Sequence, residues 1–148
     1  MTDEQQTILL AEADVAVRRS AQSLLKARNF KVAPATDFES AQKLLATQSF
    51  DLAVVGTDLG AGPGGFVLLR SLRAASEDRP VIMIAANDEL EDVLAAFRLG
   101  AADVVLKPLR PSELMAVINR ALGVAANVAA VQSGMNPAVT DSQETVDG

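Results

Sequence analysis

The sequence contains no cysteine and no histidine. Without cysteine the protein has no disulfides and no thiolate metal ligands, and without histidine it lacks the commonest acid–base catalyst and metal ligand. The side chains left for chemistry are carboxylates, lysines and hydroxyls. These absences exclude the usual zinc sites and every mechanism that depends on an imidazole.

A long apolar run and an apolar leader are missing as well. Residues 1–7 are polar and acidic, unlike a signal peptide, and no stretch approaches the roughly 20 apolar residues that a membrane helix needs. The net charge of −6 argues against non-specific binding to nucleic acid or to anionic membranes. We expect a cytoplasmic protein that binds neither nucleic acid nor membrane.

Apolar runs and helical periodicities alternate along the 148 residues, of which 49% are hydrophobic. This content is enough for one core. Strands are predicted at 7–11, 30–34, 52–55, 80–85 and 102–106, with Pro34 confining the second to an edge. Helices are predicted to begin at or near Asp14, Asp37, Phe66, Asn87 with Asp88, and Pro111. Five such units predict an α/β fold, a doubly wound parallel sheet with helices on both faces.

The fourth helix has clear signals at both ends. Asn87 and Asp88 are expected to cap its start, and Gly100 is expected to end it in a left-handed conformation. Its apolar members recur at helical spacing, which predicts an amphipathic helix. They are Leu90, Val93, Leu94 and Phe97.

The composition changes at Gly123. Residues 123–148 contain Asp141, Glu144 and Asp147 but no base, so we divide the chain into a domain, 1–122, and an acidic tail, 123–148, that contains Ala, Val and Ser. Residues 132–148 are expected to be disordered. Residues 124–131 either share that disorder or extend the last helix, because alanine is the best helix former; they would then lead toward a partner or a dimer seam.

The third predicted strand carries the position that decides the function. Leu52 to Val55 form an unbroken apolar run, typical of a strand buried on both faces, and sites in such sheets lie beyond the carboxyl ends of the strands. This strand ends in Gly56 instead of a carboxylate, and Asp58 follows two residues later.

Over roughly residues 7–122 the chain resembles the receiver domain of response regulators, the CheY-like superfamily. The resemblance rests on residues 8–14 (ILLAEAD) with 16–19 (AVRR), 50–52 (FDL), 65–70 (GFVLLR), 100–103 (GAAD) and Lys107-Pro108. It implies a flavodoxin-like sheet of order 2-1-3-4-5 with five helices. It also implies an Asp at the end of the third strand that takes a phosphoryl group from a histidine kinase, with Mg²⁺ held by acids of the first strand–helix turn.

Carried over residue by residue, the family's acidic pair falls on Glu12 and Ala13, and its phosphoacceptor falls on Gly56. The hydroxyl residue that ends the fourth strand falls on Ala85, and the switch aromatic of the fifth falls on Val104. The family's Lys and the Pro after it match as Lys107 and Pro108.

These departures have a chemical consequence that does not depend on the family. Phosphoryl transfer to a protein needs a carboxylate nucleophile and a cation, and Mg²⁺ needs one or two carboxylates in near-octahedral geometry. Gly56 offers no nucleophile, and Glu12 is the one carboxylate kept. We expect no catalytic residues, no metal and no cofactor. The expected protein is a pseudo-receiver that binds a signalling protein or effector, independently of phosphorylation, in a two-component phosphorelay of bacterial type.

Two alternatives stay open. In one, Asp58 accepts a phosphoryl group, which requires it to move by two strand positions, roughly 6 to 7 Å. In the other, the loop Gly60 to Gly65, which matches G-x-G-x-x-G, binds a nucleotide or another small ligand. Pro63 weakens this reading because it removes an amide that would cradle phosphate.

Lys107 and the apolar residues of the last elements each have two interpretations. Lys107 is either an exposed relic or the partner of Glu12 in the pocket, since an isolated buried charge is costly. Phe97, Val104 and Leu109 either form a partner surface, as that face does in the family, or belong to the core. A homodimer is a further option for the partner.

Overall fold

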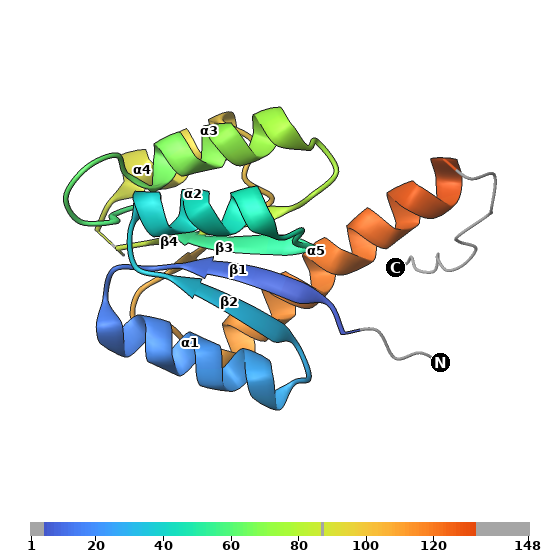
Figure 1. The fold of residues 1–148 in the computed structure, drawn as a ribbon, viewed down its shortest axis with the longest axis horizontal. Helices are drawn as coiled ribbons and strands as arrows, with labels where there is room; N and C mark the ends of the chain where they lie inside the picture. The colour runs from blue at the N-terminus through green and yellow to red at the C-terminus, as the bar shows by residue number, and fades with distance from the viewer. Residues whose placement is uncertain (1–4, 87, 133–148) are drawn as a thin grey trace.

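The computed structural model describes residues 5–86 and 88–132. Five strands form one parallel sheet of order β2-β1-β3-β4-β5 (Figure 1). The strands are β1 (Thr7–Ala11), β2 (Lys31–Ala35), β3 (Leu52–Gly56), β4 (Val81–Ala85) and β5 (Asp103–Leu106). The predicted doubly wound sheet and its strand order are confirmed.

Helices cover both faces of the sheet (Figure 1). They are α1 (Val15–Ala27), α2 (Phe38–Thr47), α3 (Gly65–Ala75), α4 (Leu90–Arg98) and α5 (Pro111–Gln132). Buried residues of α1 and α5 join one apolar cluster, and those of α2, α3 and α4 join the other. The molecule is therefore a three-layer sandwich with two helices on one face of the sheet and three on the other.

Strand β3 is the middle strand, and all five of its residues are buried. Alternation sends Leu52 and Val54 into the cluster under α1 and α5, and Ala53 and Val55 into the cluster under the other helices. This confirms the strand buried on both faces that the apolar run predicts. It also places Gly56 where the sheet's interior gives way to its carboxyl edge.

Several local sequence signals act as predicted. The Asp14 side chain caps α1 by accepting from the Val17 amide at 3.1 Å, and α2 begins directly after Asp37. The capping box that Asp37 forms with Ser40 was not predicted. Gly100 follows α4 with φ of 103°, in the left-handed region that glycine tolerates.

The predictions for α4 are partly wrong. The helix starts at Leu90, and its N-cap is Glu89 without a side-chain capping bond. Asp88 lies outside the helix because the chain is still turning there, with the Glu89 amide donating to the Ala86 carbonyl at 3.2 Å; Asn87 lies outside the described residues. Ala96 is the fully buried member of α4, whereas three of the large apolar residues expected to form the helix's apolar face are exposed: Leu90, Leu94 and Phe97.

The last helix is long. It continues without a break to Gln132, which confirms the alternative that 124–131 extend it, and Figure 1 shows its end projecting beyond the sheet. Gln132 was expected to be disordered, and this is wrong because α5 includes it. The rest of that segment, 133–148, lies outside the described residues, and the division at 122 stays a prediction. No helix within the described ranges is long and apolar enough to cross a membrane.

Candidate functional site

The parallel strands bring four of the predicted pocket residues to one edge of the sheet. Glu12 directly follows β1, Gly56 ends β3, Ala85 ends β4, and Lys107 directly follows β5. The strand registers pair Ala11 with Val55 and Ala85 with Leu106. Because the carboxyl ends of parallel strands share an edge, residues up to 95 positions apart in sequence become neighbours here.

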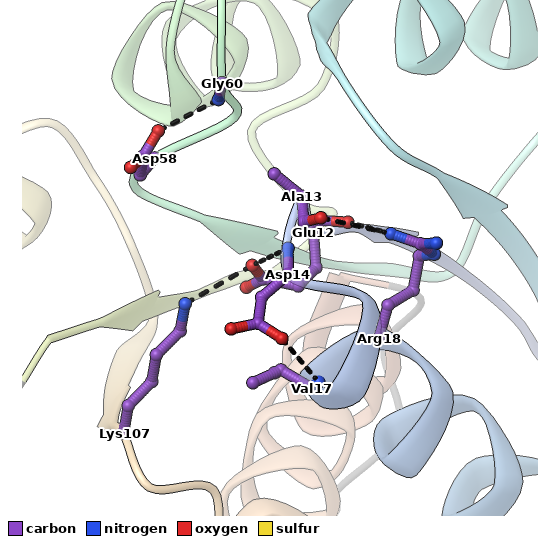
Figure 2. A network of polar contacts seen from close by, with 8 residues as sticks. All are labelled: Glu12, Ala13, Asp14, Val17, Arg18, Asp58, Gly60 and Lys107. Carbon is purple, nitrogen blue, oxygen red and sulfur yellow. Dashed lines mark hydrogen bonds and ion pairs between the residues drawn. The ribbon is translucent and has the colours of Figure 1, made fainter.

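Glu12 is the buried charged residue at this edge, with no exposed surface. Its Oε2 accepts a hydrogen bond from the Asp14 amide at 2.9 Å and lies 3.4 Å from the Lys107 Nζ (Figure 2). Its Oε1 is buried without a partner in the described part of the chain. Of the two interpretations of Lys107, the pair with Glu12 is therefore the one present, and Lys107 supplies the opposite charge that a buried carboxylate requires.

A contact that the sequence analysis missed holds the turn between β1 and α1. The Arg18 guanidinium donates to the Glu12 carbonyl at 2.8 Å and to the Ala13 carbonyl at 3.4 Å. Arg18 comes from the first turn of α1, which Asp14 caps. Side chains on a helix point toward its N-terminus, so an Arg four residues after an N-cap faces back over the start of its helix. The spacing of Asp14 and Arg18 could therefore have predicted this contact.

Gly56 lacks a side chain, and the Glu12 side chain fills the space beside it. A Cβ built at position 56 would lie 2.6 Å from the Glu12 Oε1 and 3.1 Å from its Cδ. On the other side, a Cβ at Gly65 would run into the Gly56 carbonyl, so α3 begins with its backbone directly against the end of β3. The end of the middle strand is enclosed by a carboxylate and by a helix start.

The two alanines of the pocket contribute no polar group. Ala85 is fully buried, and its carbonyl accepts from the Lys107 amide at 2.8 Å. Ala13 is half-buried, next to Glu12 on the turn. Their methyl groups leave the Glu12 carboxylate and the Lys107 ammonium as the facing charges of this pocket.

The resemblance implies Mg²⁺ at this edge, and the residues present do not fit that ion. The buried oxygen Oε2 of Glu12 already faces an amide and an ammonium, and Asp14 is exposed with its Oδ1 bonded to the Val17 amide. Among the described residues, no group of three or more acids is placed to hold a metal. A cation that needs near-octahedral carboxylate and water ligands has no such set here.

Asp58 lies away from the pocket. Its side chain is exposed, and its Oδ1 accepts from the Gly60 amide at 2.9 Å, so it closes a turn within its own loop. Figure 2 shows it pointing toward Gly60 and away from Glu12 and Lys107. In this position Asp58 shares no contact with the groups that a phosphorylated site would use.

The glycine-rich loop runs to Gly64, and Gly65 opens α3. Gly60 and Gly62 have φ of 80° and 90°, a region that other residues rarely adopt. The backbone path therefore accounts for these two glycines. The proposed nucleotide site in this loop stays a prediction.

The structure does not gather the predicted partner surface into one patch. Phe97 is 47% exposed, whereas Val104 and Leu109 are half-buried and pack against opposite apolar clusters. The sequence analysis missed the exposure of Leu90, Leu94 and Leu106. Helical periodicity indicated a stripe on α4, but it does not say that the smaller Ala96 faces the sheet and the stripe faces outward.

The family model for the response regulator receiver domain matches residues 8–119. The chain belongs to the response regulator receiver family. This receiver is 37% identical over 123 residues to the regulatory protein VirG of Agrobacterium tumefaciens (strain 15955), covering 82% of this chain and 45% of the relative. With VirG of Rhizobium rhizogenes it shares 35% identity over 117 residues, 78% of this chain and 47% of the relative. The receiver thus spans about half the length of these relatives.

Solved structures agree with the fold. The receiver domain of NtrX from Brucella abortus superposes with a TM-score of 0.74 at 27% identity, covering 78% of this chain and 97% of that one. A CheY-like receiver domain protein from Methanospirillum hungatei JF-1 gives a TM-score of 0.78 at 22% identity, covering 84% and 99%. The second likeness bears on the fold alone.

Proposed function

We propose that this receiver is a pseudo-receiver: a non-enzymatic protein–protein interaction module that works without phosphorylation in cytoplasmic two-component signal transduction. Receiver domains act through contacts with other proteins, such as kinases and effectors. The observation that carries the proposal is the Glu12 carboxylate, which fills the space beside Gly56 and pairs with Lys107. The negative charge at the carboxyl edge is therefore the Glu12 carboxylate, a permanent part of the chain, and not a phosphoryl group added to it.

Phosphoryl transfer would need two things that this edge lacks. The first is a carboxylate at the tip of β3, and the residue there is Gly56. The second is a cation between acids to neutralise the equatorial oxygens, and the donor set does not fit Mg²⁺. Glu12 is not a substitute nucleophile because its carboxylate is buried against Lys107.

The Glu12–Lys107 pair also determines how this receiver could change its conformational state. In a site regulated by phosphorylation, negative charge beside the lysine comes and goes with the phosphoryl group. Here the charge beside Lys107 is a carboxylate of the same chain, 3.4 Å away. Any change of state then comes from a partner that binds one conformation better than another and shifts the populations.

The direct test is incubation of the full chain with acetyl phosphate and Mg²⁺, followed by intact-mass spectrometry. We expect no species heavier by one phosphoryl group. The Asp58→Ala variant is the matched control, because Asp58 is the exposed acid nearest in sequence to the end of β3. A phosphoryl group that appears in the parent chain and is lost in this variant overturns the proposal and assigns the acceptor to Asp58.

A second measurement examines binding without covalent chemistry. Beryllofluoride with Mg²⁺ mimics an acyl phosphate, so a titration followed by amide NMR reports on metal and phosphoryl sites together. We expect the amides of Glu12, Gly56 and Lys107 to stay unchanged. Saturable shifts at these three amides contradict the proposal even where no phosphoryl group is transferred.

A further inference from the structure

Basic residues gather in one stretch of this acidic chain. Residues 15–36 contain five bases and no acid, within a chain whose net charge is −6. None of the five forms an ion pair within the described residues. They are Arg18, Arg19, Lys26, Arg28 and Lys31. Their positive charge is therefore not neutralised by acids of the described part of the chain.

Four of these bases, all but the half-buried Arg18, are exposed on α1 and at the start of β2. Arg19 and Lys26 are seven residues apart, about two helical turns, so both lie on one side of the helix. Arg28 is the C-cap of α1, and Lys31 begins β2. We call the four exposed bases the α1 face.

Most of the α1 face lies at the end of the sheet that α5 also reaches. Buried residues of α1 and α5 join one apolar cluster, and both helices run from the carboxyl edge of the sheet to the opposite edge, where the strands begin. Helix α1 stops there at Ala27, whereas α5 continues past this edge and ends at Gln132 (Figure 1). The chain therefore enters residues 133–148 from the same end of the sheet as Lys26 and Arg28.

We propose that residues 133–148, which we call the tail end, fold back and dock on the α1 face of their own chain. The tail end contains Asp141, Glu144 and Asp147 and no base, so its charge is opposite to that of the face. The proposal goes beyond the proposed function, because it concerns a contact within the chain and does not depend on whether the domain accepts a phosphoryl group.

The tail end is long enough for this contact. Its three acids lie nine, twelve and fifteen residues after Gln132, which corresponds to roughly 30, 40 and 50 Å of fully extended chain. The return path is about 14 Å along the part of α5 that follows Gly123, plus about 10 to 12 Å to cross the width of one helix. The acids can therefore reach the near end of the α1 face.

Tethering makes the contact possible even though its ion pairs are weak. Exposed ion pairs contribute little individually and are screened by salt. A short tether holds the acids near the face at an effective concentration in the millimolar range, so that several weak pairs act together. The docked form is thus in equilibrium with an open form, and added salt favours the open form.

Other acidic occupants fit the α1 face less well. Nucleic acids and anionic membranes present negative charge over large surfaces, and a chain with a net charge of −6 is repelled by them outside this face. The nearest competitors within the chain are Asp3 and Glu4, because the side chain of the adjacent Gln5 donates to the Asn29 carbonyl at 3.1 Å. The experiment must therefore report on the tail end itself.

The test places a spin label in the tail end. The chain has no cysteine, so Ser142→Cys provides a single site for a nitroxide, and amide NMR of the full chain shows which residues lie near it. We expect line broadening concentrated on residues 19–31 and lost in about 1 M salt, where the Debye length is about 3 Å. The acidic start of α4 should stay unaffected, because like charges repel.

Matched variants of the labelled chain test the charges on both sides. Asp141→Asn, Glu144→Gln and Asp147→Asn together nearly preserve the shape of the tail end and should remove the broadening. Arg19→Glu with Lys26→Glu should remove it as well, and adding Asp141→Lys, Glu144→Lys and Asp147→Lys to that variant should restore it. Both bases are exposed, so unchanged amide spectra outside α1 verify the fold.

Three results overturn the proposal. Broadening that persists in the variant with the neutral tail end shows a contact that does not depend on these charges. A label that leaves α1 unaffected shows that the tail end does not dock there, as expected if Asp3 and Glu4 hold the face instead. Equal broadening of an isotope-enriched chain without a label, mixed with labelled chain, shows a contact between two copies instead of within one.

Discussion

The carboxyl edge of the sheet and the start of α4 both carry acids, but only the acid at the edge is paired with a base in the described structure. At the carboxyl edge a single buried carboxylate, Glu12, is matched by the Lys107 ammonium. At the start of α4 four acids lie together without an ion pair in the described structure, and their repulsion raises the pKa of Glu89. The charge at the edge is neutralised within the fold, whereas the acids of α4 form no ion pair within the described residues.

Among the variants that test this comparison, we expect the largest loss of stability when Lys107 is replaced. We expect Lys107→Met to lower the free energy of unfolding by about 2 to 3 kcal/mol, which is less than the roughly 3 to 5 kcal/mol for a broken fully buried pair because Lys107 is partly exposed. Urea denaturation measures it. The control is Lys43→Met, which removes an exposed pair at 3.9 Å from Glu39 and should cost less than about 0.5 kcal/mol.

Adding Glu12→Gln to Lys107→Met sharpens the same test. The double variant should regain at least half of the lost stability, because no buried charge is then left unpaired. If Lys107→Met costs no more than Lys43→Met, the buried carboxylate does not depend on its lysine and the comparison fails.

The next effect concerns the space beside Gly56. We expect Gly56→Asp to destabilise the chain by roughly 1 to 3 kcal/mol, as overpacking does, because its Cβ would meet the Glu12 Oε1 at 2.6 Å. The substitution alone should not bring phosphoryl uptake from acetyl phosphate. Adding Glu12→Ala should restore stability, since the new carboxylate then has room and Lys107 as its counter-charge.

Gly123 provides the matched control for this substitution. It lies within α5, and a Cβ built there would meet nothing within 4 Å. Gly123→Ala should therefore be neutral or stabilising, by up to about 1 kcal/mol. A Gly56→Asp variant as stable as the parent would show that Glu12 does not hold this space.

The smallest effect lies on α4. Repulsion from Asp92 and Asp88 raises the pKa of Glu89, so folding favours its protonated form and this advantage is lost as pH rises through the folded-state pKa. Glu89→Gln should therefore melt at a slightly higher temperature than the parent at pH 7. The difference should vanish below pH 4.5, the ordinary value for a glutamate carboxyl, and thermal melts at the two pH values measure it. A difference that persists in acid assigns the effect to something other than repulsion.

The fold was predictable from the sequence because its signals are local and agree with one another. Apolar runs indicated the strands, and Asp14, Asp37 and Gly100 marked the ends of helices. The Glu12–Lys107 pair was one of two interpretations of Lys107, and it was considered because an isolated buried charge would be costly. The conformation of the Glu12 side chain was not predicted, because its contact with the space beside Gly56 depends on the packing of two strands and a loop.

The orientation of α4 could not be predicted from hydrophobic periodicity. A hydrophobic period places Leu90, Leu94 and Phe97 on one side of the helix but does not say which side meets the sheet. Ala96 faces the sheet instead. A short side chain lets the helix lie close to β4 and β5, and that choice belongs to tertiary packing.

The reach of α5 has a mechanical consequence. Its 22 residues make a rod about 33 Å long at 1.5 Å per residue, and the side chains that anchor it to the sheet, such as Leu114 and Ile118, lie in its first half. A tilt of a few degrees at this anchored base is amplified into a displacement of ångströms at Gln132.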